Sequence, residues 1–338
     1  MFATILKMIL RRFLVAVPTL VIVALLLFTV LRLLPVDPAA MSLPPNATVA
    51  ELENMRREMG LDRPLPAQVG IWMGQILSGD FGMSIQLRRP VRTLVGEALP
   101  ATIELALLSM VVAAVLGIAG GLIAFHFRGT SGEAALDVGS IALLSLPDFL
   151  LALILMLIFG VWLQWLPFML RLDPGIERPV VTGFLLLDTL LVVRPDAFFS
   201  ALRHMVLPCA ALGVAASPAI MRVLRSSLLD VYQEDYIHQA RLRGLSERQV
   251  LMRHALKNAI LPTLGLMGVQ FGFLFGGTLL VEMIFSYPGL GNLMIEAIRN
   301  VDLPVIQAVG LTYCVMALLI SLVVDALYLI LNPRLRSR

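Results

Sequence analysis

The sequence predicts an all-α polytopic membrane protein with six transmembrane helices, and three observations support this prediction. Hydrophobic residues make up 59% of the 338-residue chain and charged residues 14%, whereas soluble domains are nearer to half apolar and a quarter charged. The hydrophobic residues gather in runs close to the ~20 residues that a helix needs to cross a bilayer. Lysine and arginine gather in the short loops between these runs, and such an asymmetry orients membrane proteins.

The first hydrophobic run, Phe13–Val30, follows Arg11 and Arg12. It is longer than the apolar core of a secretory signal peptide and no clean cleavage site follows it, so we expect a retained span. We expect five further spans at 100–125, 138–163, 203–223, 259–285 and 306–331. The expected organisation is therefore 1–34 as N-terminus and first span, 35–99 as an external region, 100–331 as a five-helix core, and 332–338 as a tail.

A shorter apolar segment, Phe184–Val193, is about half the length of a span and is interrupted by Asp188. Segments of this length are more often interfacial or re-entrant. A seventh span here would place the most basic loop and the basic C-terminal tail on opposite sides of the membrane. We therefore expect an external interfacial helix, whose role the sequence leaves open.

Positive charge predicts the orientation, because short loops rich in lysine and arginine stay in the cytoplasm. The region 35–99, with a polar helix expected near 49–59, also carries arginines, but long loops cross the membrane largely regardless of charge. Both termini and a loop at about 224–258 are therefore expected in the cytoplasm. The basic residues that this assignment places there are Lys7, Arg11, Arg12, Arg128, Arg222, Arg225, Arg241, Arg243, Arg248, Arg253, Lys257, Arg334, Arg336 and Arg338.

The loop at about 224–258 contains signals for a helix end. Arg241 and Arg243 are cations suited to the C-terminus of a helix. Gly244 follows them, and glycine is the residue best able to take the left-handed conformation that closes a helix. We therefore expect a first helix that ends at Gly244.

A second helix is expected to start directly afterwards. Ser246 is placed to act as its N-cap, and Gln249 three residues later completes a capping box. Leu245 and Val250 flank the cap where a hydrophobic staple would pack. Together these signals predict an elbow that presents a short helix at a fixed angle in a loop between membrane spans.

The elbow on its own is compatible with an ordinary cytoplasmic loop. A DNA-binding helix-turn-helix is disfavoured, because an apolar span follows at once and no free domain surrounds the elbow. The segment ARLRGLSERQVLMRHALKNAILP, however, resembles the cytoplasmic loop of binding-protein-dependent ABC importer permeases of the dipeptide, oligopeptide and nickel branch. Gln239 stands where many members have alanine.

The resemblance covers nearly the whole chain. The pieces RLLPVDPA, GLDRPLPAQ and GDFGMSI in the external region are similar to the same family, as are VEMIFSYPGLGNL and the closing DALYLILNPRLR. In the last of these, Asn332 stands where aspartate is more usual.

The resemblance implies a type I ABC importer transmembrane domain in a bacterial inner membrane, surrounded by membrane lipid. It implies as partners a homologous second permease, two ATP-binding subunits and a periplasmic solute-binding protein, with no role for nucleic acid. ATP and magnesium would be bound by the ATP-binding subunits, so no cofactor is expected in this chain. The elbow would be the element that contacts these subunits, through Tyr236, Ala240, Arg241, Gly244, Leu245, Ser246 and Glu247.

Four carboxylates lie in or beside the hydrophobic runs. A carboxylate at the centre of a membrane helix costs roughly 2.5–3.5 kcal/mol, so it usually faces the bundle interior, a cavity or a partner. For Glu104 and Asp325 a structural role is favoured over contact with a transported solute. For Asp148, which follows Pro147, and for Glu282 the two roles are weighted about equally.

The sequence shows no hydrolytic, redox or metal-binding pattern, so an enzyme is not expected. It has no phosphate-binding loop, and its cysteines, Cys209 and Cys314, fall inside hydrophobic runs. An intramembrane aspartyl protease using Asp148 and Asp325 is one alternative, but neither aspartate has the sequence context of that class. An ion-coupled secondary transporter is another, and it predicts internal repeats, which we do not detect. The solute remains open among dipeptides, oligopeptides, glutathione, nickel complexes and sugars.

Overall fold

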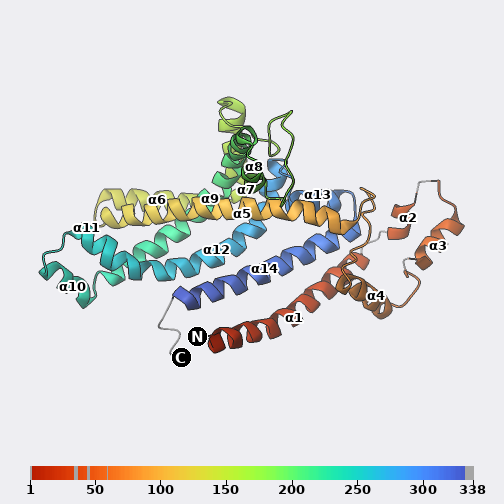
Figure 1. Ribbon diagram of the computed structural model, residues 1–338, viewed down its shortest axis with the longest axis horizontal. Helices are drawn as coiled ribbons and strands as arrows, with labels where there is room; N and C mark the ends of the chain where they lie inside the picture. The colour runs from red at the N-terminus through yellow and green to blue at the C-terminus, as the bar shows by residue number, and fades with distance from the viewer. Residues whose placement is uncertain (1, 34–36, 44–45, 59, 332–338) are drawn as a thin grey trace.

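The computed structural model describes residues 2–33, 37–43, 46–58 and 60–331. Its longest helices lie side by side along one axis of the molecule (Figure 1). Within the described residues, five helices are long and apolar enough to cross a membrane. They are Leu14–Arg32 in α1 (Phe2–Arg32), α5 (Val91–His126), α9 (Pro195–Val231), the continuous helix Glu247–Ile284, and Leu303–Leu327 in α14 (Leu303–Leu331).

The third expected span is not one straight helix. It consists of α6 (Ser131–Ser145) followed by α7 (Asp148–Leu155) and the π-helix η1 (Met156–Trp162), and the two parts meet at 100°. A proline disfavours the helical conformation in the residue before it, and Leu146, which precedes Pro147, is extended with φ −90° and ψ 122°. Counted as one bent span, this pair brings the total to the six that the sequence predicts.

The short apolar segment after the bent span forms α8 (Leu185–Leu191), which is too short to be a span, as expected. Asp188 does not face outward from this helix but is fully buried. Its carboxylate accepts hydrogen bonds from the backbone N–H groups of Val181, Thr182 and Gly183. Burial alone would raise the pKa of Asp188, but these hydrogen bonds and one from the Thr182 hydroxyl hold it below its ordinary value.

The centre of the bundle is the crossing of α5 and α9. A Cβ atom at Gly117 of α5 would lie 2.6 Å from Cβ of Ile220, and one at Gly213 of α9 would lie 2.6 Å from Cγ1 of Val112. Small residues at such positions let two backbones approach closely, which is how membrane helices gain packing contacts. α12 (Leu256–Ile284) packs on α9, and α14 packs on α1 and α12.

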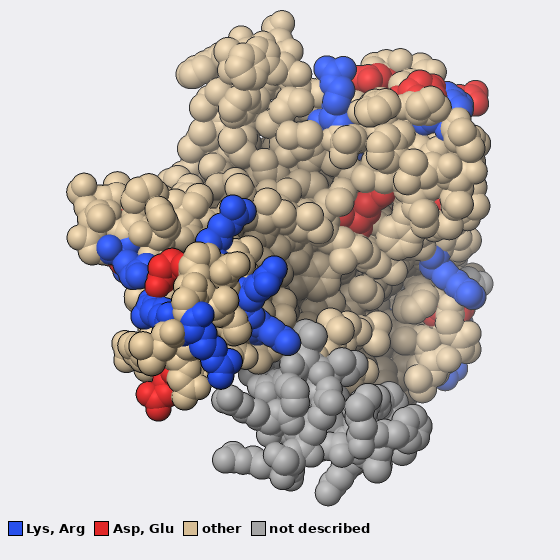
Figure 2. All heavy atoms as spheres, turned by 60° about the vertical axis from the view of Figure 1, so that its left-hand side comes forward, with Lys and Arg blue, Asp and Glu red and all other residues tan. Residues whose placement is uncertain are grey.

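Basic side chains gather at one end of the bundle. The start of α1, the described end of α14 and the elbow helices α10 (Asp235–Leu242) and α11 (Glu247–Gln249) lie at one end (Figure 1). Figure 2, which turns this end forward, shows lysine and arginine side chains gathered there with few acidic ones. The expected tail 332–338 lies outside the described residues, as do the side chains of the basic residues near the N-terminus.

The other end of the bundle carries the region 35–99, expected to be external, and a short helix before the last span. Asp302 fastens this region to the bundle, since its buried carboxylate accepts hydrogen bonds from the Ser84 hydroxyl and from the backbone N–H of Gln86. The polar helix expected near 49–59 is confirmed. The elements at this end are α2 (Pro38–Ser42), α3 (Val49–Glu58), α4 (Leu65–Leu77) and α13 (Leu290–Arg299).

Candidate functional site

The first half of the elbow ends as the sequence predicts. Gly244 has a φ of +78°, in the left-handed region that glycine tolerates best. Its N–H donates to the carbonyl of Arg241 at 2.9 Å, and the N–H of Leu245 donates to the carbonyl of Ala240 at 3.4 Å. This pair of bonds is a Schellman motif. A Cβ atom at Gly244 would meet nothing within 4 Å, so the constraint on this residue is its backbone conformation rather than space.

The second half of the elbow starts with the expected capping box. The N–H of Gln249 donates to Oγ of Ser246 at 3.4 Å, and the N–H of Ser246 donates to Oε1 of Gln249 at 3.1 Å. Both bonds satisfy backbone donors that the first turn of a helix leaves without partners. The angle between the two halves is thus set by interactions within a few residues of the corner.

The second half differs from the prediction in one respect. It is not a separate short helix, because α11 continues through the π-helix η2 (Val250–Ala255) directly into α12. The expected loop boundary at 258 falls inside this continuous helix, and the boundary at 224 falls inside α9. Basic residues between Arg248 and Lys257 hide the start of the span in the sequence, because they interrupt its apolar run.

The underside of the elbow packs on the ends of three long helices. Ile237 and Ala240 of α10 are buried together with Val250 of η2. Leu245, expected on the contact surface, is partly buried against the same cluster, which contains its predicted staple partner Val250. The other buried members of this cluster are Phe125 of α5, Leu224 and Leu228 of α9, Ala255 of η2 and Ala259 of α12.

Two arginine side chains of the elbow region stack on aromatic rings. The Arg128 guanidinium lies 4.4 Å from the ring centre of Phe125, and that of Arg241 lies 5.2 Å from the ring centre of Tyr232. Arg241 also bridges the corner, because its Nε donates to Oε1 of Glu247 at 2.7 Å. This hydrogen bond raises the pKa of Arg241, while burial raises that of Tyr232. Arg241 and Glu247, both expected to contact the ATP-binding subunits, therefore also hold the elbow in shape.

Tyr236 ties the two halves together at another point, since its hydroxyl accepts a hydrogen bond from Nδ2 of Asn258 at 2.8 Å. The outer surface of the elbow instead carries Leu242, whose exposed fraction is 89%, beside exposed Arg243. Leu242 is not among the contact residues expected from the sequence. The signal was available, because Leu242 lies ~200° around the helix from buried Ala240 at 3.6 residues per turn.

Glu282, near the end of α12, caps the next helix along the chain. Its fully buried carboxylate accepts hydrogen bonds from the backbone N–H groups of Gly291 at 2.7 Å and Asn292 at 3.2 Å, in the first turn of α13. The Thr102 hydroxyl of α5 donates to the same carboxylate at 2.7 Å and accepts from the N–H of Leu290 at 2.8 Å. Three orphan donors of α13 are thus satisfied by two membrane helices.

Glu104 has the same kind of role at α8. It forms a buried ion pair with Arg171 and accepts hydrogen bonds from the backbone N–H groups of Leu185 at 3.2 Å and Leu186 at 2.7 Å. Like Glu282, it binds the N-terminal turn of a short helix, where the helix dipole favours negative charge. Two further ion pairs join α6 and α9, because Arg225, expected on the cytoplasmic surface, binds both Asp137 and Glu133.

Asp148 of α7 and Asp325 of α14 lie beside different levels of α12. Asp148, at the corner of the bent span, is partly exposed, and its Oδ2 would lie 2.8 Å from a Cβ at Gly277. Asp325 is partly buried and adjoins Val324, which packs on Gly268. Nine residues of helix separate the two glycines, or about 14 Å at 1.5 Å per residue. This separation argues against a proton-sharing pair of carboxylates, and the described residues contain no cluster able to hold a metal ion.

Comparison with protein families identifies the architecture. Residues 115–337 match the family described as binding-protein-dependent transport system inner membrane component, and residues 5–106 match the N-terminal part of such membrane components. The chain belongs to this family. It is a multi-pass inner-membrane permease subunit of an ABC importer and not an enzyme, so the resemblance and the fold class read from the sequence are confirmed.

Individual relatives match this chain over their full length. The permease is 36% identical over 333 residues to the glutathione transport system permease protein GsiC of Escherichia coli strain K12. It is 37% identical over 333 residues to the protein of the same name from Salmonella typhi. Each comparison covers 98% of this chain and 100% of the relative. The protease and secondary-transporter alternatives are therefore wrong.

The contacts of the carboxylates predict different outcomes for two substitutions. Glu282→Gln should lower the free energy of unfolding of the purified permease by about 1–3 kcal/mol, because an amide cannot accept all the hydrogen bonds that cap α13. The amount of assembled importer and solute uptake should then fall together. Asp148→Asn should change uptake while the amount of assembled importer stays constant.

A matched control for Glu282 is Glu296→Gln, since Glu296 is an exposed residue of the same short helix and surface substitutions usually stay within about 0.5 kcal/mol. If Glu282→Gln left stability intact but abolished uptake, Glu282 would be a residue of the transport path and not a cap. Loss of assembly in the Asp148 variant would give that aspartate a structural role.

Proposed function

We propose that this permease carries a small peptide of the glutathione class across the bacterial inner membrane. The supporting observation is its similarity, over 98% of its length, to permeases of glutathione transport systems. It would work with a homologous second permease, two ATP-binding subunits and a periplasmic solute-binding protein. Asp148 would border the path at the corner of the bent span, while Glu104, Glu282 and Asp325 would serve the packing of the bundle.

The elbow would couple ATP binding to the path. Its exposed tip, with Leu242 beside Arg243, suits a groove with an apolar floor and an acidic rim on the ATP-binding subunit. Closure of the two ATP-binding subunits would displace the tip. Because the elbow is continuous with α12 and packs on the ends of α5 and α9, these helices would move with it between outward- and inward-open states, as a rigid-body transition.

Uptake measurements test the solute. In cells that lack their own glutathione importer, expression of this permease with its cognate subunits should restore uptake of labelled glutathione. Unlabelled short peptides should compete with it, whereas nickel salts and sugars should not. Uptake of nickel or a sugar, with none of glutathione or dipeptides, would contradict the proposed solute class.

Two substitutions at Gly244 test the coupling role. Gly244→Val forces a β-branched residue into the left-handed region, at a cost of about 1–2 kcal/mol or more, and should tilt α11 relative to α10. The spans should still insert and pair. Binding protein loaded with solute should then no longer stimulate ATP hydrolysis by the reconstituted importer, and the ATP-binding subunits should co-purify weakly.

Gly244→Asn is the matched variant, because asparagine tolerates the left-handed conformation better than other non-glycine residues. It adds a side chain at the same place and should retain most of the stimulation. Full stimulation in the Gly244→Val importer would mean that the elbow is an ordinary loop.

Cysteine labelling in intact cells tests the orientation. Ser84 is a poor labelling site because it is buried, but Leu87 in the same external loop has an exposed fraction of 47%. With Cys209 and Cys314 replaced by alanine, Leu87→Cys should react with a membrane-impermeant reagent. Leu242→Cys should react only after the membrane is opened. The reverse pattern would contradict the proposed cytoplasmic location of both termini and the elbow.

A further inference from the structure

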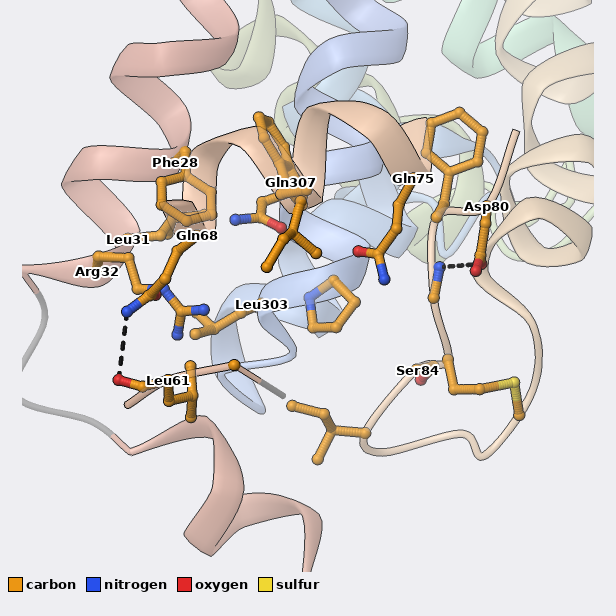
Figure 3. A pocket seen from close by; sticks show the side chains of 18 of the residues that line it. Phe28, Leu31, Arg32, Leu61, Gln68, Gln75, Asp80, Ser84, Leu303 and Gln307 are labelled. Carbon is orange, nitrogen blue, oxygen red and sulfur yellow. Dashed lines mark hydrogen bonds between the residues drawn. The ribbon is translucent and has the colours of Figure 1, made fainter. Parts of the chain in front are cut away.

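A cavity of ≈ 780 Å³ lies at the end of the bundle opposite the elbow. Figure 3 shows Phe28 and Arg32 of α1, Gln68 of α4, and Leu303 and Gln307 of α14 around it. None of the residues assigned to the elbow or the membrane carboxylates lines this cavity. It is therefore a separate feature of the permease.

The charged residues of its lining are mainly basic. Arg57 and Arg63 line the cavity and have no ion-pair partner within the described residues. Arg32, which also lines it, has a buried Nε without a hydrogen-bond partner there. The acidic residue of the lining, Asp80, already accepts a hydrogen bond from the N–H of Gly82 at 2.9 Å. Arg88 adds a further positive charge, so the cavity favours an anion.

Apart from Gln68, Gln75, Ser84 and Gln307, the uncharged part of the lining is mainly apolar, and the cavity lies where a membrane span ends. Arg32 is the last residue of the span Leu14–Arg32, so the cavity lies near the boundary between hydrocarbon and headgroups. Phe28 and Trp72 form one wall, with ring centres 5.1 Å apart, and tryptophan is enriched at this boundary. Leu31 of α1 and Ile71 of α4 extend this apolar wall, and Ile71 is partly open to the surroundings, with an exposed fraction of 40%.

We propose that this cavity binds an anionic phospholipid from the outer leaflet of the membrane. Its phosphate would lie among Arg32, Arg57 and Arg63, the planar guanidinium groups of which suit phosphate oxygens. The buried Oε1 of Gln68, which has no hydrogen-bond partner within the described residues, would accept a bond from a headgroup hydroxyl. The acyl chains would pack on the apolar side chains of the lining, Phe28, Leu31 and Ile71. A soluble anion would leave the apolar wall without a counterpart.

Native mass spectrometry of the purified importer with added phosphatidylglycerol tests this proposal. We expect one saturable high-affinity site. Each arginine near a phosphate contributes about a fivefold gain in affinity, so the double variant Arg57→Gln/Arg63→Gln should bind the lipid about 25-fold more weakly. Arg56→Gln is the control, because Arg56 neighbours Arg57 on α3 but is paired with Asp37 and does not line the cavity. It should bind as the unchanged importer does.

Glycerol phosphate, the headgroup without acyl chains, separates the two sources of phosphate. It should not displace the lipid at equal concentration, and displacement would show a site for soluble anions instead.

Equal lipid binding by the double variant and the unchanged importer would overturn the proposal. An equal loss of lipid binding in Arg56→Gln would overturn it too. If the double variant failed to assemble, Arg63→Gln alone, in an exposed turn, should still give a fivefold loss. Release of the lipid on addition of the binding protein would show a docking site for that protein instead and would also overturn the proposal.

Discussion

The constraint on which the structure depends is the unbroken helix from the elbow into the membrane. From Glu247 to Ile284 the backbone is helical without a gap. No flexible loop in this stretch can absorb a displacement of the corner, so the membrane span must move with it. The π-helix η2 lies within this stretch, and π-helical turns inside α-helices occur frequently at functional sites. The Schellman motif at Gly244 and the capping box at Ser246 then fix the direction in which α10 leaves.

A second constraint governs the opposite half of the bundle. Short helices begin there beside the membrane spans, and their first N–H groups need partners. The permease supplies these partners with carboxylates from its spans, since Glu104 binds the start of α8 and Glu282 binds the start of α13. A carboxylate inside a span is costly when isolated, but here each one meets two backbone N–H groups and a further polar side chain.

The sequence predicted the features that depend on neighbouring residues or on composition. Gly244, Ser246 and Gln249 act within six residues of one another, so their types alone indicate the elbow. The spans were recognisable because hydropathy over a long window is a property of composition. The segment after residue 183 was correctly excluded as a span because of its length.

The features that the sequence did not predict depend on distant partners. The Thr102 hydroxyl that binds Glu282 lies 180 positions away from it, and Arg225 lies 88 positions from Asp137. No local pattern marks such pairs. The break at Pro147 was visible as a possible kink, but its angle of 100° depends on how α7 packs against α9 and α12. Arg32, Arg57, Arg63 and Arg88 are spread over 57 positions of the sequence, and the fold brings them together around one cavity.

The central claim is that the elbow and α12 move as one body. Spin labels at Leu242→Cys and Phe273→Cys, positions with exposed fractions of 89% and 72%, would report the distance between the elbow tip and the span in the reconstituted importer. A second pair, Leu242→Cys with Ile22→Cys on α1, would report movement relative to the rest of the bundle. On trapping the ATP-bound state, we predict an unchanged distance for the first pair and a changed distance for the second. A shift or broadening of the distance between positions 242 and 273 would contradict a rigid connection.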